Sequence, residues 1–169
     1  DGNRFKRGRI LHALLQTLPS LPPNARPAAL AAYLAEPAHN LSAAQQSELG
    51  GEVLAVLHHP NFAPLFGPGS RAEVPLVGDV GTLKPRVISG QVDRLLVSEA
   101  TVTIVDFKTN RPPPKDETGV PEVYLRQMAA YRAALRQIYP DHEIISVLLW
   151  TDGPQLMRLS DTILDTHTP

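Results

Sequence analysis

The sequence predicts an α/β fold in which a mixed β-sheet is flanked by helices and preceded by a helical segment. Up to residue 60 the apolar residues recur at helical spacing, whereas from Arg71 the chain is rich in β-branched residues and short turns. A long amphipathic segment at 121–139 then precedes an almost continuous apolar run at 143–150. This order is typical of a crossover helix that leads into a buried parallel strand.

Three helices are expected in the N-terminal part of the chain. The second covers residues 25–35, and the third begins after a cap at Asn40 or Ser42 and ends at Pro60. The first covers residues 7–18 and is ended by the ProPro pair that follows it. It carries His12 beside an apolar stripe that consists of Leu11, Leu14, Leu15 and Leu18.

The remaining elements form the predicted sheet and its crossover. The segments AEVPLVG, RVISGQVDRLLV and TVTIVDFKT are expected to pair as an antiparallel meander, and MRLS adds a short edge strand followed by a tail. We expect one domain over residues 1–169, with a helical segment at about 7–60 and an α/β core at about 71–160. The long helix should bury a face lined by Tyr124, Met128, Tyr131, Leu135 and Ile138.

Composition excludes several classes of protein. The chain has no cysteine, which excludes a disulfide framework, a zinc-thiolate site and a cysteine-ligated iron-sulfur cluster within it. A formal net charge of −1 does not by itself indicate nucleic-acid binding. No apolar run is long enough to span a bilayer and no signal-peptide pattern opens the chain, so we expect a cytoplasmic protein without membrane contact. Because the chain starts at Asp1 without methionine, we expect a domain cut from a longer polypeptide.

Two groups of charged or polar residues are interpreted as ordinary surface. His58 and His59 end a helix before a proline, which favours surface positions or contacts with the helix dipole over metal ligation. Solvated positions are also expected for two basic clusters, namely Arg4, Lys6, Arg7 and Arg9 near the start and Arg126, Arg132 and Arg136 on the long helix.

The stretch VDFKT places a carboxylate and an ammonium group on a predicted strand. Asp106 and Lys108 are two residues apart and therefore project from the same face, after Val102 and Ile104 on that face. If the chain turns at residues 98–100, Asp93 of the preceding strand lies beside Asp106. Two adjacent carboxylates repel each other unless a cation lies between them, and Mg²⁺ or Mn²⁺ suits such oxygen ligands. The pattern indicates metal-assisted phosphodiester hydrolysis, while a surface hairpin with an ordinary salt bridge is the alternative.

Four short motifs occur in one order along the chain, namely GxxxH at 8–12, GxxD at 90–93, DFKT at 106–109 and QxxxY at 127–131. This set resembles the RecB-type nuclease branch of the PD-(D/E)XK superfamily. More narrowly, it is similar to the C-terminal nuclease domain of AddA-type helicase-nucleases, which act in bacterial double-strand-break repair. The resemblance runs from about Gly8 to Trp150, and it implies a restriction-endonuclease-like core for the α/β fold.

The resemblance implies a metal site and a catalytic lysine. Asp93, Asp106, Lys108 and Glu73 would form the catalytic set, with Lys108 orienting or deprotonating a metal-bound water. Glu73 would contact the water shell of the metal or orient Lys108. The ion would be Mg²⁺, with Mn²⁺ as a substitute, and its ligands would be His12, Asp93, Asp106 and the backbone carbonyl of Phe107.

The helix motif would support this site and contact DNA through Gln127 and Tyr131. Structural alternatives exist for these residues: His12 would be a packed or surface histidine, and Gln127 and Tyr131 would close the edge of the core.

The activity implied by the resemblance is Mg²⁺-dependent cleavage of single DNA strands that emerge from a helicase, with the 3′-terminated strand cut to leave 5′-phosphate and 3′-hydroxyl ends. The chain has no GxxxxGK[ST] motif, so ATP would be used only by helicase domains elsewhere in the parent chain. DNA, those helicase domains and an AddB-type subunit would be the partners, in the bacterial cytoplasm.

Two other functions stay open. One is a catalytically inactive module of the same fold that holds DNA or docks a subunit. The other is a stand-alone RecB-like or Cas4-like nuclease, although many such relatives use four cysteines for an iron-sulfur cluster and this chain has none.

Overall fold

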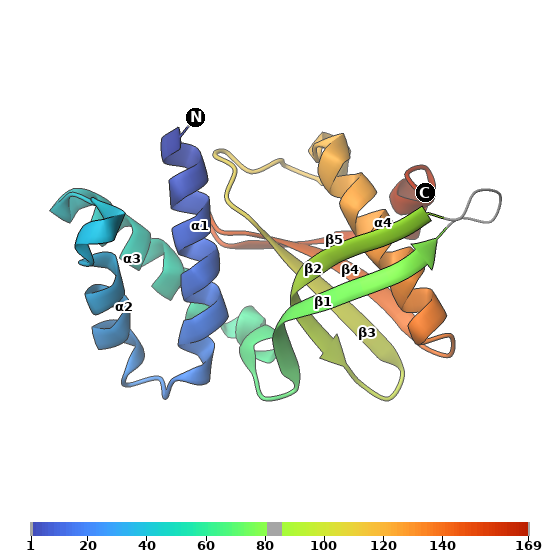
Figure 1. Ribbon diagram of the computed structural model, residues 1–169, viewed down its shortest axis with the longest axis horizontal. Helices are drawn as coiled ribbons and strands as arrows, with labels where there is room; N and C mark the ends of the chain where they lie inside the picture. Colours follow the sequence, from blue (N-terminus) through green and yellow to red (C-terminus); the bar gives the residue numbers. More distant parts are fainter. Residues whose placement is uncertain (1, 81–85, 169) are drawn as a thin grey trace.

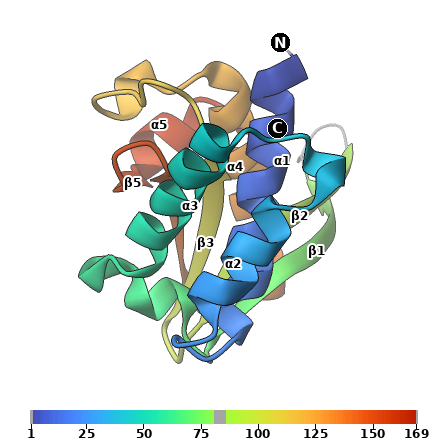
Figure 2. The ribbon, with the colours of Figure 1, turned by 90° about the vertical axis from the view of Figure 1, so that its left-hand side faces the viewer.

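A computed structural model describes residues 2–80 and 86–168 of the chain. One five-stranded sheet with the order β1-β2-β3-β4-β5 separates two layers of helices. Helices α1 (Gly2–Thr17), α2 (Arg26–Leu34) and α3 (Ala43–Leu57) cover one face, as Figures 1 and 2 show. Helices α4 (Glu122–Ile138) and α5 (Asp161–Asp165) cover the other. The predicted mixed sheet between helices is confirmed, and it is consistent with a restriction-endonuclease-like fold.

The sheet combines a meander with a crossover. Strands β1 (Ser70–Val80), β2 (Arg86–Val97) and β3 (Thr101–Lys108) pair antiparallel in that order. Helix α4 then returns the chain so that β4 (Glu143–Trp150) pairs parallel with β3, and β5 (Gln155–Leu159) closes the edge antiparallel. The expected turn between the first two strands, at residues 81–85, lies outside the described residues.

The three N-terminal helices bury the stripe that their sequence predicts. Leu11, Leu14 and Leu15 are each at most 1% exposed and pack with Phe107 on one face of the sheet. Helix α3 starts at a capping box in which the Ser42 hydroxyl accepts the Gln45 amide, as expected, but it ends at Leu57, before Pro60. Short 3₁₀ helices at Leu18–Ser20, Pro37–His39 and Pro60–Phe66 connect these elements to the sheet.

The second core lies between the sheet and α4. Val102, Ile104, Leu148 and Trp150 of β3 and β4 are fully buried there against Met128 and its neighbours on α4. The expectation for Ile138 is wrong, because its side chain is 52% exposed at the end of α4. The buried stripe passes instead through Leu125, Met128, Arg132 and Leu135.

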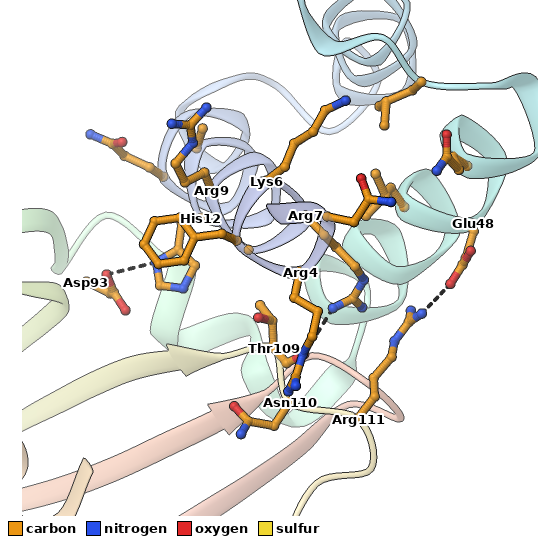
Figure 3. A pocket seen from close by; sticks show the side chains of 18 of the residues that line it. Arg4, Lys6, Arg7, Arg9, His12, Glu48, Asp93, Thr109, Asn110 and Arg111 are labelled. Carbon is orange, nitrogen blue, oxygen red and sulfur yellow. Dashed lines mark hydrogen bonds and ion pairs between the residues drawn. The ribbon is translucent and has the colours of Figure 1, made fainter. Parts of the chain in front are cut away.

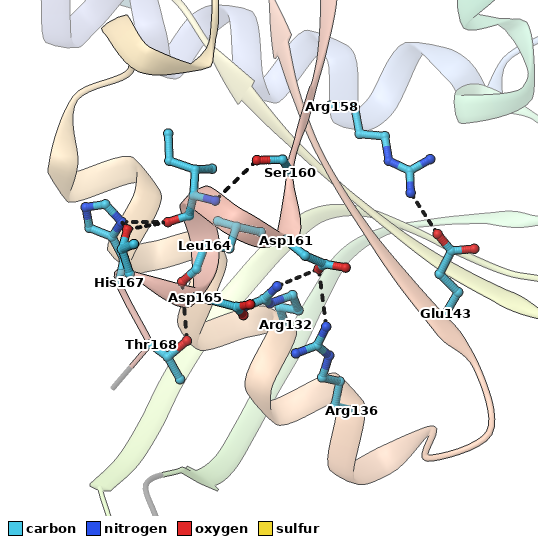
Figure 4. A network of polar contacts seen from close by, with 12 residues as sticks. Arg132, Arg136, Glu143, Arg158, Ser160, Asp161, Leu164, Asp165, His167 and Thr168 are labelled. Atoms are coloured by element: carbon cyan, nitrogen blue, oxygen red, sulfur yellow. Dashed lines mark hydrogen bonds and ion pairs between the residues drawn. The ribbon is translucent and has the colours of Figure 1, made fainter.

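The chain end is a docked helix and not the expected tail. Ser160 caps α5 by accepting the amide of Ile163, and Leu164 is 1% exposed in the core beneath it. Arg132, expected to be solvated, is only 2% exposed because α5 covers it. Its guanidinium reaches Asp161 and Asp165 at 2.5 Å each, as Figure 4 shows.

A 3₁₀ turn at Glu117–Gly119 precedes α4, and its Glu117 carboxylate accepts the Ser160 amide. Over the described residues, no helix combines the length and apolarity that crossing a membrane requires.

Candidate active site

Two acidic side chains lie where the pairing between β2 and β3 stops. The last paired residues are Arg94 and Val105, so Asp93 and Asp106 follow the end of the ladder on opposite strands. The Oδ2 atom of Asp93 accepts a hydrogen bond of 2.7 Å from the backbone amide of Phe107. Because the ladder has ended, no β2 carbonyl accepts the Phe107 amide, and the Asp93 carboxylate takes the place of that acceptor. The carboxylate therefore points between the two strands. Both carboxylates are buried, at 8% and 4% residue exposure.

Lys108 projects from the same face of β3 as Asp106, as the two-residue spacing predicts. Its Nζ atom lies 2.5 Å from Asp106 Oδ2 and donates to Gln127 Oε1 at 3.0 Å. The same ammonium lies 3.8 Å from the ring centroid of Tyr124, a cation-π contact. Three groups thus hold the lysine, and two of them come from α4.

The electrostatics of the pair follow from its burial. Burial raises the pKa of the Asp106 carboxyl, and neighbouring Asp93 raises it further, while Lys108 and His12 oppose the rise. A carboxylate in this position gains from any additional positive charge.

His12 approaches Asp93 from α1. Its Nδ1 atom lies 3.4 Å from Asp93 Oδ1, and its ring meets the Phe107 ring edge-on with centroids 5.7 Å apart. Burial lowers the pKa of His12, but the hydrogen bond to Asp93 and its charge outweigh burial, so the pKa is raised above its ordinary value. Gly8 allows this close approach because it faces Thr109, the residue after β3: a Cβ atom there would lie 3.3 Å from Thr109 Oγ1.

Glu73 lies on β1 at the position opposite Asp93. The β1–β2 ladder pairs Ala72 with Arg94 and Val74 with Val92 and omits the pair between them. Glu73 has a φ of 50°, a conformation that is strained for a residue with a Cβ atom. Burial raises the pKa of its carboxyl, and Asp93 adds to this rise. Among the described residues, Glu73 and Lys108 form no ion pair or hydrogen bond, so Gln127 and Tyr124 orient the lysine instead.

The GxxD and QxxxY motifs are packed directly against each other. Gln127 Nε2 donates to the Tyr131 hydroxyl at 3.2 Å, and that hydroxyl donates to the Gln91 carbonyl at 3.2 Å. A Cβ atom on Gly90 would lie 2.6 Å from both the ring and the hydroxyl of Tyr131. Gly90 of the GxxD motif is therefore needed so that Tyr131 of the QxxxY motif can lie over the strand.

Tyr124 was not identified from the sequence as a site residue. It contacts Lys108 with its ring and donates from its hydroxyl to Asn110 Oδ1 at 3.0 Å. Its position three residues before Gln127, hence on the same helix face, is the signal from which this contact was foreseeable.

His58 and His59 lie at the end of α3 and do not join the site. The His59 ring stacks on the Phe62 ring, with their centroids 3.9 Å apart.

The donor set suits a divalent cation in its chemistry. Among residues 2–80 and 86–168, no three His, Cys, Asp or Glu side chains are already gathered around one point that would hold an ion. The Oδ2 atom of Asp106 contacts the Lys108 ammonium. To bind a metal ion, this oxygen would have to exchange the ammonium for the ion. The Lys108 carbonyl accepts from Thr151 on the β4 side, so the Phe107 carbonyl faces the β2 side, toward Asp93. Carboxylate and carbonyl oxygens are hard donors that suit Mg²⁺ or Mn²⁺, and the His12 imidazole can join them once it is deprotonated.

A cavity of about 1220 Å³ lies beside α1 and reaches Asp93, and residues of α3 and of the segment after β3 also line it. His12 and Asp93 lie at one side of it, as Figure 3 shows, and Glu73, Gln91 and Tyr124 also line it. A substrate that entered the cavity would reach the Asp93 carboxylate without any unfolding of the core.

The fold and this acidic cluster define a restriction-endonuclease-like domain with an open polar site. A family model described as the PD-(D/E)XK nuclease superfamily matches residues 1–158, and the chain belongs to this superfamily, whose members are generally nucleases. A search of curated proteins finds no match. Among solved structures, the crystal structure of SSO0001 is similar over 98% of this chain and 83% of that one, with 17% identity and a TM-score of 0.38.

Proposed function

We propose that this chain is a Mg²⁺-dependent deoxyribonuclease domain that hydrolyses phosphodiester bonds of DNA. The observation that carries this proposal is the group of Asp93, Asp106 and Lys108, which lies buried at the end of the β2–β3 ladder, with Asp93 lining a cavity of about 1220 Å³. Two buried carboxylates side by side weaken a fold unless a cation or a proton neutralises them, and a cation held there would lie where it can act on a reacting phosphate.

The metal would be held by Asp93 and Asp106, with the Phe107 carbonyl and His12 completing its protein ligands. When bound, the ion would supply charge stabilisation and an activated water. Asp93 is already oriented by the Phe107 amide, and the contact with Asp93 keeps the His12 ring turned toward the site.

Lys108 would act on the phosphate once Asp106 is engaged by the ion. Gln127 and Tyr124 keep the ammonium in place after it loses its carboxylate partner, which leaves its positive charge for the anionic transition state. Tyr131 supports Gln127, and Glu73 would contact water at the other side of the carboxylates.

The biological setting that we propose is end resection in double-strand-break repair. The support is the order of the four motifs, which resembles the nuclease domain of AddA-type enzymes, together with the way Gly8, Gly90 and Tyr131 make their contacts. The single domain would then be part of a longer bacterial helicase-nuclease in the cytoplasm. Its partners would be helicase domains of the same chain and an AddB-type subunit, and ATP would be used only by those helicase domains.

The test is cleavage of an end-labelled single-stranded DNA by the purified chain in Mg²⁺, in Mn²⁺ and in chelator. Asp106→Asn and Lys108→Met should each reduce cleavage by at least about 100-fold, since each removes a group that stabilises charge in the transition state. Asp141→Asn is the matched control, because Asp141 is an exposed carboxylate on the loop after α4.

Binding of Mn²⁺ separates an enzyme from an inactive module. Calorimetry should show a binding event that is lost in Asp106→Asn and kept in Asp141→Asn. A chain that neither cuts DNA nor binds Mn²⁺ would instead be a DNA-holding or subunit-docking module of the same fold.

A further inference from the structure

Helix α1 presents a continuous polar and aromatic stripe to the cavity. Phe5, Arg9, His12 and Gln16 all line the cavity and follow one another at spacings of four, three and four residues, so they share one face of the helix. Phe5 is 77% exposed, although it is a large aromatic side chain. The buried residues of α1 are Ile10, Leu11, Leu14 and Leu15, none of which belongs to this stripe, so packing does not require an aromatic group at position 5.

The stripe leads directly to the acidic cluster. Seven residues of α-helix span about 10 Å, so Phe5 lies two turns from His12, which contacts Asp93. A polymer that follows the stripe from Phe5 therefore reaches His12 beside the Asp93 carboxylate.

The charge around Phe5 is positive and largely uncompensated. Arg7 and Arg111, which also line the cavity, form ion pairs with Glu52 and Glu48. Within the described residues, no ion pair engages Arg4, Lys6 or Arg9, and Lys6 donates only to the neutral Asn40 carbonyl at 3.3 Å. The basic cluster interpreted as ordinary surface is thus partly structural and partly a lining of the cavity.

We propose that this stripe is a subsite for single-stranded DNA, in which Phe5 stacks on a base and Arg9 contacts a phosphate. Aromatic side chains among cations are the common physical solution for holding single strands, because every base has a π-face and every nucleotide a charge. A duplex already stacks its bases on each other and offers none to Phe5. The inference rests on the proposed nuclease function, since that function brings a strand to Asp106.

The neighbours of Phe5 favour a polyanion over a protein partner. The core of a protein interface is apolar and depleted of charge, whereas Phe5 lies between Arg4 and Lys6 and one turn from Arg9.

The first experiment places a reporter at position 5. Phe5→Trp should lose fluorescence when a dT oligomer is added in chelator at low salt, where the chain binds DNA without cutting it. Trp150 is fully buried and provides a constant background. Ile138→Trp is the matched control, because Ile138 is 52% exposed at the far end of α4 and does not line the cavity.

The second experiment measures affinity for the same oligomer and for a blunt-ended DNA hairpin whose loop is a linker without bases. Phe5→Ala should weaken binding of the oligomer by roughly 10-fold, as expected for the loss of one stacked base, and Phe5→Tyr should restore it. Binding of the hairpin should change less than about twofold. Arg9→Gln should reduce the salt slope of oligomer binding by about 0.7.

The outcomes separate this proposal from the nuclease proposal. Unquenched Phe5→Trp, or equal losses for oligomer and hairpin in Phe5→Ala, would overturn the subsite even if the chain cuts DNA. Quenching with a selective loss for the oligomer, in a chain that never cuts, would support the subsite and reject the nuclease.

Discussion

Asp93 is the residue through which three elements meet at the site. Its Oδ2 accepts the Phe107 amide of β3, and its Oδ1 faces His12 of α1 at 3.4 Å. The side chain itself belongs to β2, at 8% residue exposure. Within the described residues, His12 has no other carboxylate in hydrogen-bond contact. Removing the charge of Asp93 should therefore change the protonation of His12 first.

The first prediction concerns the protonation of His12. Its pKa is raised in the folded chain, so the charged pair with Asp93 stabilises the fold fully below a pH of about 6.5, and this contribution is lost as the pH rises through the folded pKa. In Asp93→Asn the pKa of His12 should fall, because burial then dominates. An NMR titration of the His12 ring protons in the unchanged chain and in Asp93→Asn measures this. An unchanged titration of His12 in the variant would contradict the contact.

The second prediction concerns Gly90. A Cβ atom there would lie 2.6 Å from Tyr131, so Gly90→Ala should lower the free energy of unfolding by about 1–3 kcal/mol. Gly51→Ala is the matched control: nothing lies within 4 Å of a Cβ there, and alanine should stabilise α3 by up to about 1 kcal/mol. Urea unfolding of both variants decides the matter, and equal stabilities would show that Tyr131 moves aside freely.

At the scale of elements, α4 serves the site with one part of its surface and anchors the chain end with another. Gln127 and Tyr124 hold Lys108, while Arg132 lies on the buried stripe four residues after Met128 and pairs with α5. The aliphatic stem of an arginine suits such a stripe as long as its head finds acceptors. Helix α5 supplies these acceptors and covers the end of the core with Leu164.

The third prediction tests this anchor. Replacing Asp161 and Asp165 by asparagine should cost about 2 kcal/mol, because a buried guanidinium loses both charged partners while the aspartates themselves are largely hydrated. The control is Glu143→Gln, which removes the exposed pair with Arg158 shown in Figure 4 and should cost less than about 0.5 kcal/mol. Chemical denaturation and amide exchange of α5 measure the two effects. Equal losses would mean that α5 docks through Leu164 alone.

At the scale of the whole molecule, one sheet carries two cores. Strand β3 gives Val102 and Ile104 to the α4 side and Val105 and Phe107 to the α1 side, all at most 2% exposed. Because both helical layers pack on the same sheet, loss of the sheet exposes apolar residues of each layer at once.

The fourth prediction is therefore cooperative unfolding. Trp150 reports on the α4 side, whereas helices α1, α2 and α3 contain more helical residues than α4 and α5 and dominate the far-UV circular dichroism. Urea curves from Trp150 fluorescence and from circular dichroism should coincide in midpoint and slope. A loss of helix signal before the fluorescence change would mean that the N-terminal layer unfolds independently.

The sequence by itself determined the kinds of elements, their order and the shared face of Asp106 and Lys108, because these depend on the local periods of helices and strands. The resemblance of the four ordered motifs to a nuclease family also came from the sequence, and the superfamily is confirmed. The roles predicted for individual site residues stay predictions.

Only the tertiary structure decided which side chains of different elements contact one another. The β2–β3 ladder stops at Arg94, so Asp93 turns to a backbone amide, and this depends on how two strands diverge. The burial of Arg132 and the docking of α5 depend on contacts between residues about 30 positions apart in the sequence. A helix of five residues is also too short for its apolar pattern to be recognised from the sequence. Tyr124 faces Lys108 for the same reason: helical spacing defines its face, but the crossing of α4 over the sheet decides what that face meets.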